Sequence, residues 1–266
     1  MISNRAFEKL TSLVKHHSGI HLAESKKQLV VGRLSKRLRH LGLDDYEAYH
    51  DHCIASPEEL ETMINTITTN ETSFFRESHH FDFMREIILP HVKKGPFRVW
   101  SAAASIGAEG YSIAMDLDDV LTSKGIEWEV LGTDINTEVL KQASEGLYPI
   151  RFADQIDEHY LKNYCLRGTG KHEGEFLIDD YLRNKVHFKT ANLMEAIPNE
   201  LGKFDVIFLR NMLIYFDNDN KKRIINNVLR VLKQGGYLFI GHAETIGHIT
   251  SAVQQVRPTI YRNEIR

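Results

Sequence analysis

Apolar residues recur at helical spacing in the first part of the chain. Phe7, Leu10 and Val14 predict a helix that ends at Gly19. A second helix is expected from about residue 26 to 41, ended by Gly42, and Asp44 and Asp45 can open a short third helix. The last helix begins at Ser56-Pro57-Glu58-Glu59, a capping serine followed by a first-turn proline and a glutamate, and carries the apolar stripe Leu60, Met63, Ile64 and Ile67. Residues 1–69 are therefore expected to form an all-α domain.

From Phe97 the pattern changes to short apolar runs that alternate with helical segments. The expected strands are residues 97–102, 130–133, 204–209 and 237–240, and the expected helices include 107–124 and 220–233. This alternation predicts an α/β domain, residues 97–266, with a parallel sheet covered by helices on both faces. Such sheets bind ligands at the carboxyl ends of their strands. Residues 70–96 are expected to be a linker between the two domains.

The alternation breaks between about residues 166 and 190. Gly168, Gly170 and Gly174 are typical turn residues, and the flanking segments have the character of short antiparallel strands. We expect an antiparallel β hairpin subdomain, inserted in the α/β domain at about 166–190.

Composition narrows the class of protein. The 266 residues are 42% hydrophobic and 26% charged, with a net charge of −3, which favours neither nucleic acid nor an anionic membrane as partner. The two cysteines, Cys53 and Cys165, suggest no disulfide framework. No signal peptide or membrane span is evident, so a cytoplasmic protein without membrane insertion is expected. The histidines are scattered, and the adjacent pairs do not share a helix face, so no metal site is expected.

The first expected strand runs into a turn of small residues, Ser101 to Gly110, and the next strand ends at Asp134. Small residues let a ligand approach the backbone, and an acid at the second strand end can accept hydrogen bonds from ribose hydroxyls. The two features together predict a nucleoside-containing cofactor. On this pattern alone, a tight turn followed by a helix-capping aspartate explains the residues equally well.

The turn argues against a dinucleotide. Ser105 stands where the first glycine of Gly-x-Gly-x-x-Gly would be, and Glu109 lies where a pyrophosphate would dock and would repel it. An acid there suits a ligand without phosphate that ends in an ammonium group. S-adenosylmethionine is such a ligand, and an arginine is then needed for its carboxylate.

Three segments resemble signature motifs of the bacterial chemotaxis receptor glutamate methyltransferases, the CheR family. They are Asn70-Glu71-Thr72-Ser73-Phe74-Phe75-Arg76, Phe204 to Phe216, and Gly235 to Glu244. The resemblance covers nearly the whole chain in the right order. It implies a Rossmann-like, seven-stranded S-adenosylmethionine-dependent methyltransferase fold. It also implies cofactor contacts from Asn70, Thr72, Arg76, Glu109, Asp134, Asn192, Leu193, Arg210 and Asn211. The chain departs from the family's usual turn at Ile106, Ala108 and Gly110.

The resemblance also implies a reaction: methyl transfer from the sulfonium to a glutamate carboxylate, giving a methyl ester and S-adenosylhomocysteine. A carboxylate is already ionised at neutral pH, so neither a general base nor a metal is required. Arg76 could hold a carboxylate and Tyr215, expected at the end of its strand segment, could donate a hydrogen bond near the methyl group. Two alternatives remain: a non-catalytic cofactor-binding signalling module of the same fold, and a nucleic-acid methyltransferase. Asn211 to Tyr215 is faintly similar to the Asn-Pro-Pro-Tyr motif of the latter, without its prolines.

The expected partner is the cytoplasmic domain of a chemotaxis receptor. The helix at 26–41 carries Lys26, Arg33, Lys36, Arg37 and Arg39, and a cationic face would steer an acidic receptor helix, although such runs are more often solvated surface. The glycine-rich hairpin Arg167–Gly174 is similar to the longer hairpin of family members that bind the receptor's C-terminal tail peptide by strand addition.

Overall fold

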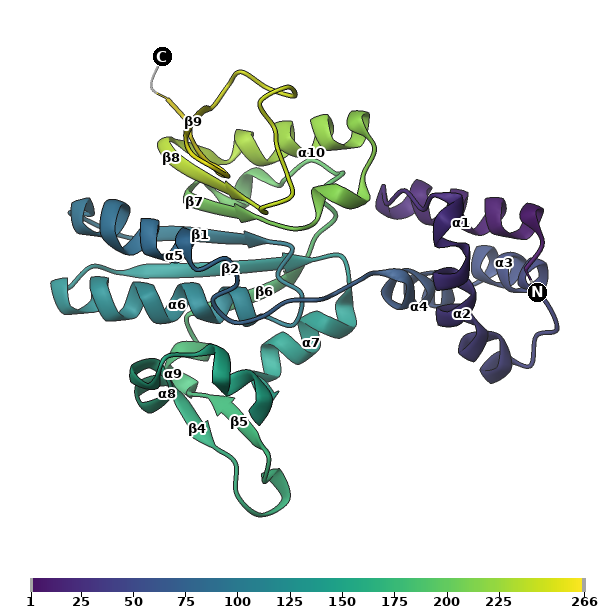
Figure 1. Ribbon diagram of the computed structural model, residues 1–266, viewed down its shortest axis with the longest axis horizontal. Coiled ribbons are helices and arrows are strands. Elements are labelled where there is room, and N and C mark those ends of the chain that lie inside the picture. The colour runs from purple at the N-terminus through teal and green to yellow at the C-terminus, as the bar shows by residue number, and fades with distance from the viewer. Residues whose placement is uncertain (1, 265–266) are drawn as a thin grey trace. The chain divides into compact units, whose positions relative to one another are not determined.

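The computed structural model describes residues 2–264, which fall into two compact units (Figure 1). One unit comprises the residues up to Thr69 together with Ile214–Lys221. The other comprises Asn70–Leu213 and the chain from Lys222 onward. Each unit has its own hydrophobic core. Among residues 2–264, no helix has the length and apolar character needed to cross a bilayer.

The first unit is all-α, as expected. Its helices are α1 (Asn4–Ser18), α2 (Lys27–Leu41), α3 (Tyr46–Ala55) and α4 (Pro57–Ile67). Gly19 and Gly42 end α1 and α2 in the left-handed conformation that glycine adopts without strain. Asp45 and Ser56 cap α3 and α4 by accepting hydrogen bonds from backbone N–H groups of the first turn. The helices enclose a core that includes Leu10, Val30, Leu34, Tyr49 and Met63.

Two arginines of α2 are structural, which corrects the prediction that this helix presents them for docking. Arg37 forms a two-pronged ion pair with Glu59, whose side chain is 5% exposed and also accepts a hydrogen bond from the Tyr49 hydroxyl. Burial opposes ionisation, but hydrogen bonds from Arg37 and Tyr49 lower the pKa of Glu59. Arg33 donates to the backbone oxygens of Ile67 and Thr68 at the end of α4. The exposed cations of the helix are Lys36 and Arg39.

The second unit is built on a sheet whose strand order, within the described residues, is β6-β2-β1-β7-β8-β10-β9. The strands are β1 (Phe97–Ala102), β2 (Trp128–Asp134), β6 (Val186–Thr190), β7 (Phe204–Leu209), β8 (Leu232–Ile240), β9 (Gln254–Arg257) and β10 (Ile260–Arg262). The first five in spatial order are parallel, and β10 runs antiparallel to both its neighbours. The parallel strands bring the ends of β1, β2, β6, β7 and β8 to one edge of the sheet (Figure 1).

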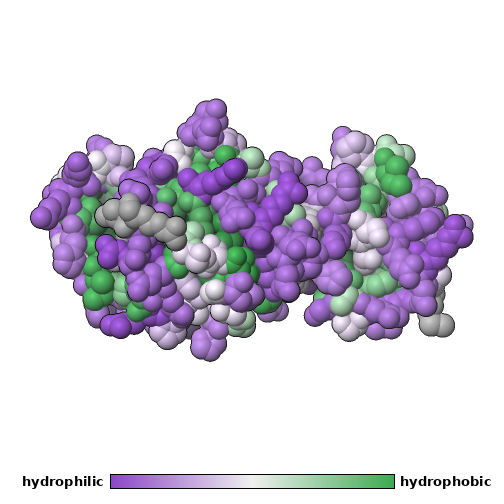
Figure 2. Space-filling view, turned by 90° about the horizontal axis from the view of Figure 1, so that it is seen from above, coloured by the Kyte–Doolittle hydropathy of each residue, from purple (hydrophilic) through white to green (hydrophobic). Residues whose placement is uncertain are grey.

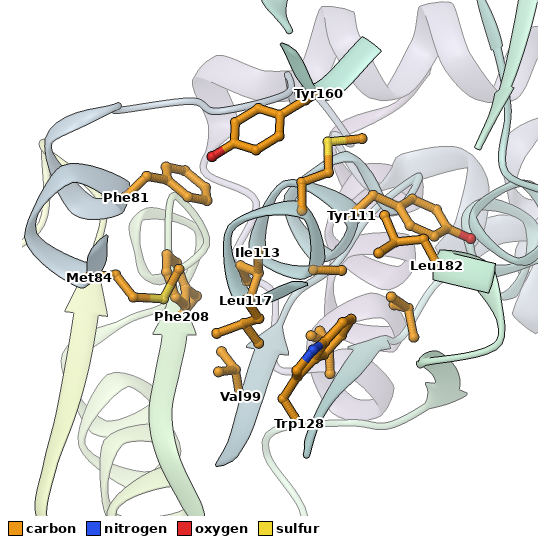
Figure 3. Packing of buried hydrophobic residues seen from close by; sticks show 14 of the residues in the cluster. Phe81, Met84, Val99, Tyr111, Ile113, Leu117, Trp128, Tyr160, Leu182 and Phe208 are labelled. Carbon is orange, nitrogen blue, oxygen red and sulfur yellow. The ribbon is translucent and has the colours of Figure 1, made fainter. Parts of the chain in front are cut away.

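Helices cover this sheet. They include α5 (His79–Phe83), α6 (Ala108–Leu121), α7 (Thr137–Glu145) and α10 (Asn218–Arg230), whose first residues group with the all-α unit. A π-helical turn, Met84–Ile88, and the short 3-10 turn Leu89–His91 extend α5 within the segment expected to be a linker. In the core, Val99 and Phe208 from the sheet pack with Ile113 and Leu117 of α6 and Phe81 of α5 (Figure 3). The region 70–96 is thus partly helical and anchored in this core.

A small antiparallel sheet of order β3-β5-β4 stands apart from the main one. Its strands are β3 (Leu147–Pro149), β4 (Cys165–Arg167) and β5 (Glu175–Ile178), and α8 (Glu158–Tyr164) and α9 (Asp180–Arg183) flank it. The predicted antiparallel insertion exists, but its boundaries differ from 166–190. The small sheet includes β3, which precedes residue 166 in the sequence, whereas Val186–Thr190 forms β6 of the main sheet.

One further element differs from expectation. The last helix ends at Arg230, three residues early, and β8 begins at Leu232 and runs through Gly235-Gly236 with an irregular register against β7. Figure 2 shows the molecule from above: hydrophilic residues cover most of the visible surface, and hydrophobic residues appear in smaller areas between them.

Candidate functional site

The turn from β1 into α6 forms the floor of the candidate site. It is pinned to the end of β2, because the backbone N–H of Ala104 donates to the Thr133 carbonyl and that of Ser105 donates to Asp134 Oδ2, at 2.8 and 2.9 Å. Ser105 and Gly107 have φ of 49° and 86°. Only glycine adopts such values without strain, so the turn at Ser105 is held by its contacts. Its departures from the family pattern leave α6 intact, and Gly110 lies within the helix.

Asp134 ends β2 and is half-buried. Its Oδ1 accepts a hydrogen bond from the Asn136 N–H at 3.0 Å, and Oδ2 accepts the one from Ser105. Burial raises the pKa of Asp134, and the backbone hydrogen bonds oppose that rise. Ile135 supplies a third backbone hydrogen bond, and a carboxylate has about four lone-pair sites, so Asp134 retains capacity to accept from one ligand hydroxyl.

Glu109 lies in the first turn of α6 and is 8% exposed. Its Oε1 accepts from Ser101 Oγ and its Oε2 from Arg210 Nε, both at 2.6 Å. Arg210 follows β7 and is also buried. It donates to the Arg76 carbonyl, and its guanidinium lies over the rings of Phe81 and Phe208. Arg210 was predicted to contact cofactor; the structure places it in the interior as the counter-ion of Glu109.

The segment from Asn70 to Glu77 lies against this turn. Ser105 Oγ donates to the Asn70 carbonyl at 2.9 Å. The Phe75 N–H donates to Ser112 Oγ, and the Phe75 ring stacks on Tyr160 with centroids 5.2 Å apart. Thr72 and Arg76 are half-buried, and Arg76 Nη1 donates to the Glu71 carbonyl at 2.9 Å. Asn70 is therefore tied to the turn through Ser105, and Arg76 is tied to Arg210, the partner of Glu109. Thr72 lies between Asn70 and Arg76 in the sequence.

Asn211 follows Arg210 and has a φ of 56°. Its backbone N–H donates to Glu244 Oε2 at 3.0 Å, and its Nδ2 donates to Glu77 Oε1 at 3.0 Å. Sequence reasoning missed both acids as site residues. The sequence offered a signal for each. Glu244 ends one of the motifs that resemble the family, and Glu77 directly follows the predicted site residue Arg76.

Asn192 and Leu193 follow β6. The Asn192 side chain accepts a hydrogen bond from the Met194 N–H at 3.0 Å, and Leu193 is buried, its carbonyl accepting from Asn227 Nδ2. The Ala191 N–H donates to the Asp134 carbonyl, which ties this strand end to that of β2. An apolar side chain two residues after Ala191, in the segment tied to the end of β2, suits the base of a nucleoside.

Tyr215 differs from its expected position at the end of a strand segment. β7 ends at Leu209, and Tyr215 lies in the 3-10 turn η8 (Leu213–Tyr215). It groups with the all-α unit, where its carbonyl accepts a hydrogen bond from the His21 N–H at 2.8 Å.

One group of potential metal ligands occurs near the site: atoms of Glu77, His79 and His80 lie within 4.8 Å of one another. His80 Nε2 lies 2.8 Å from Thr259 Oγ1, and its Nδ1 lies 3.1 Å from Arg210 Nη1. Burial, with the neighbouring Arg210 cation, lowers the pKa of His80 to about 2. A guanidinium against the same ring opposes a second cation, so we assign no metal to this group.

The donor set fits S-adenosylmethionine better than a dinucleotide. Asp134 at the end of β2 and Glu109 in the first turn of α6 flank the turn, and the Glu109 side chain occupies the helix start at which a pyrophosphate would dock. Carboxylates instead suit ribose hydroxyls and an ammonium group.

Comparison with known proteins gives matches over nearly the whole chain. Residues 5–68 match the all-alpha domain of CheR methyltransferases and residues 70–262 match their SAM-binding domain. A chemotaxis protein methyltransferase of Salmonella typhimurium is 40% identical, over 98% of this chain and 90% of that protein. A chemotaxis protein methyltransferase 2 of Pseudomonas aeruginosa and one from Escherichia coli are each 39% identical, over 96% and 98% of this chain and 91% of each relative.

Proposed function

The chain belongs to the CheR methyltransferase family, and we propose that it methylates glutamate side chains of chemotaxis receptors, forming methyl esters. It is an S-adenosylmethionine-dependent methyltransferase with the Rossmann-like fold of that class. The observation that carries the proposal is a pair of acids, Asp134 at the end of β2 and Glu109 in the first turn of the helix after β1, in a chain about 40% identical to chemotaxis protein methyltransferases. Because these relatives act in chemotaxis, a receptor is the proposed acceptor, and the cytoplasm, where receptor signalling domains lie, is the proposed location.

The cofactor supplies an electrophilic methyl group on a sulfonium. In our proposal Asp134 accepts hydrogen bonds from its ribose, Glu109 faces its ammonium group, and Leu193 with Asn192 lies against its base. Asn70, Thr72 and Asn211 complete the binding set. Arg210 would act indirectly, by holding the Glu109 carboxylate through its 2.6 Å ion pair.

The proposed acceptor needs little chemical activation. A glutamate carboxylate has a reference pKa of about 4.3 and is ionised at neutral pH, so no general base is required. Opposite charges neutralise as the methyl is transferred, and excluding water from the site would favour that step. Arg76 is half-buried whereas Arg210 is enclosed, so Arg76 is the arginine that we propose holds a carboxylate. Tyr215 belongs to the all-α unit, so we assign it no part in this site.

The experiment that tests the proposal is transfer of label from methyl-labelled S-adenosylmethionine. The protein is incubated with membranes that contain a chemotaxis receptor, and with DNA and RNA in parallel. Label in the receptor band is expected. Label in nucleic acid would favour the nucleic-acid alternative, and cofactor binding without any transfer would favour a non-catalytic signalling module. The names of the relatives, all methyltransferases, give the latter no support.

We further propose that the small sheet binds a receptor tail peptide. β4 is an edge strand, so its outer backbone groups can pair with an extended peptide. Leu147, Leu177 and Leu166 are in register across the three strands, and Leu166 is 51% exposed. The row offers apolar contact beside that edge, and Arg167 can meet an acidic or carboxyl group.

The tail-peptide proposal has a direct test. Leu166→Asp should abolish binding of tail peptides from receptors of the same organism, because it places a charge in the apolar row. Ile54→Asp, at a residue 61% exposed in the other unit, is the matched control. Deleting Gly168–Gly170 should have the same effect as Leu166→Asp, while cofactor binding survives. Absence of binding by the wild-type protein would contradict the proposal.

Docking through α2 must be tested at its exposed cations. Lys36 and Arg39 are three residues apart and so share a face of the helix. Reversing both to glutamate should reduce receptor methylation at low salt and leave cofactor affinity unchanged. The double reversal of Lys93 and Lys94, exposed lysines of the second unit, changes the net charge equally. Equal methylation by the two double variants would refute docking through α2.

A further inference from the structure

Phe75, Glu77 and Asn211 adopt left-handed backbone conformations in two segments of the candidate site. Their φ angles are 48°, 57° and 56°. None is glycine, and residues with a side chain adopt this region only where their surroundings hold them there. Phe75 and Glu77 bracket Arg76, and Asn211 follows Arg210. The question is which contacts hold these conformations.

The Glu77 side chain connects the segment 70–77 to the segment that carries Asn211. Its Oε1 accepts hydrogen bonds from Asn211 Nδ2 at 3.0 Å and from the His242 N–H at 3.1 Å. One carboxylate oxygen therefore joins the segment 70–77 to the residues after β7 and after β8. Asn211 is held on its other side by Glu244, which accepts from its backbone N–H.

The peptide of Arg76 is fixed from both directions. On one side the Phe75 N–H is bound by Ser112 and its ring by Tyr160. On the other, the Arg76 carbonyl accepts from Arg210 Nη1, and the next residue is Glu77. Removing the Glu77 contacts would leave the second side of Arg76 held by the Arg210 contact, without the hydrogen bond to the residues after β8.

We propose that Glu77 is a positioning residue for methyl transfer: its Oε1 sets the orientation of Asn211 and Arg76 toward cofactor and acceptor. This rests on the proposed function and on the binding set given there. Glu77 acts through these neighbours, because its side chain is 14% exposed and its Oε2 is enclosed, 3.6 Å from His80 Nδ1 and 3.8 Å from Arg210 Nη1. Its task is to accept two hydrogen bonds, which an uncharged amide oxygen can also do.

Two substitutions of nearly equal volume separate this role from others. Glu77→Gln keeps an acceptor, whereas Glu77→Met fills the space without one. We expect Glu77→Met to weaken S-adenosylhomocysteine binding, measured by calorimetry, and to lower kcat/KM by about 30-fold or more, because small misplacements of binding groups are costly. Glu77→Gln should stay within about threefold of wild type in both measurements, since its hydrogen bonds persist.

The control is Asp205→Leu. Asp205 lies in the same strand that precedes Asn211, toward its other end, and its Oδ2 also accepts two hydrogen bonds, from the Arg98 N–H and Lys233 Nζ. It should lose stability without a comparable change in binding. If Glu77→Met does not fold, Glu77→Ala also removes both hydrogen bonds and is compared with Glu77→Gln in the same two measurements.

Three results would overturn the proposal. The first is an unchanged affinity of Glu77→Met for S-adenosylhomocysteine. The others are a Glu77→Gln affinity as low as that of Glu77→Met, or an equal loss of affinity in Asp205→Leu. Binding is measured without an acceptor protein. A wild-type protein that binds S-adenosylhomocysteine but methylates no receptor would therefore refute the proposed function and leave the role of Glu77 still measurable.

Discussion

Two arginine–glutamate pairs, one in each unit, have the same chemistry and different surroundings. Arg37 and Glu59 join α2 to α4, and Arg210 and Glu109 join the end of β7 to the start of α6. Each glutamate side chain has a second partner, Tyr49 for Glu59 and Ser101 for Glu109. The Arg37 side chain is 28% exposed, whereas that of Arg210 is 2% exposed and also contacts the segment that carries Arg76.

The difference shows what an ion pair can indicate about function. Both arginines were predicted to be functional, Arg37 in docking and Arg210 in cofactor contact. Both are engaged within the fold. The contacts of Arg37 stay among packed helices, so its pair serves stability. Arg210 holds a carboxylate and a loop that both belong to the candidate site, so the same interaction there would also set cofactor binding.

The largest expected effect comes from Arg210→Met. It leaves Glu109 buried without its counter-ion, and breaking such a pair costs about 3–5 kcal/mol of stability. Urea unfolding should show this loss, and calorimetry should show S-adenosylhomocysteine binding abolished. A variant with normal cofactor affinity would contradict the role given to the Arg210–Glu109 pair.

Arg37→Met should have a smaller effect of a different kind. The hydrogen bonds of Arg37 to a charged group, at a partly exposed site, are worth about 2–3 kcal/mol, so the free energy of unfolding should fall by that amount. S-adenosylhomocysteine affinity, measured under conditions where the variant is folded, should not change. A parallel loss of affinity would show that the two pairs do not differ in function as described.

Asp134→Asn tests the cofactor site without an ion pair. The variant keeps an oxygen for one backbone N–H and loses the charge that strengthens hydrogen bonds from ribose hydroxyls. Cofactor binding should weaken by about 1.5–3 kcal/mol in calorimetric titration. Asp205→Asn is the control. Asp205 lies near the start of β7, whereas Asp134 lies at the end of β2, and the two strands run in the same direction. Equal affinities of the two variants would remove Asp134 from the binding set.

The smallest expected effect concerns Asp116, a fully buried acid that accepts hydrogen bonds from Arg85 and Tyr160. Burial raises the pKa of Asp116 to about 6, so its protonated form is favoured in the folded state. The stabilisation from protonation is complete below the unfolded pKa, near 4, and is lost as the pH rises through 6. Between pH 7 and pH 4 the wild type should gain about 1–2 kcal/mol relative to Asp116→Asn, measured by urea unfolding. Parallel pH profiles would contradict this.

The elements with a long apolar pattern were predictable. Phe97–Ala102 and Phe204–Leu209 were located to the residue, and Gly19, Gly42 and Ser56 ended or began helices as expected. Short strands such as β3 and β10 have three residues each, too few for a periodic pattern. The strand ends placed Asp134 and Glu109 at one edge of the sheet, because parallel strands share direction.

Partners distant in sequence were not predictable. Glu59 lies 22 residues from Arg37, and the carbonyl oxygens that Arg33 binds lie 34 and 35 residues away, so a run of cations on one helix resembled a free surface. The contacts of Glu77 are more distant still, 134 and 165 residues along the chain. Such contacts follow from the order of strands in the sheet, which a single sequence does not specify.

The most direct test of the central claim is the chemical nature of the methylated product. Receptor labelled by this protein from methyl-labelled S-adenosylmethionine is treated with mild base, and volatile methanol is collected. A glutamyl methyl ester releases its label as methanol, whereas a methylated amine retains it. We predict that the label is released from the wild-type reaction, and that no label is incorporated by the Asp134→Asn and Arg210→Met variants at limiting cofactor. Label that stays on the receptor after base treatment would contradict carboxylate methylation.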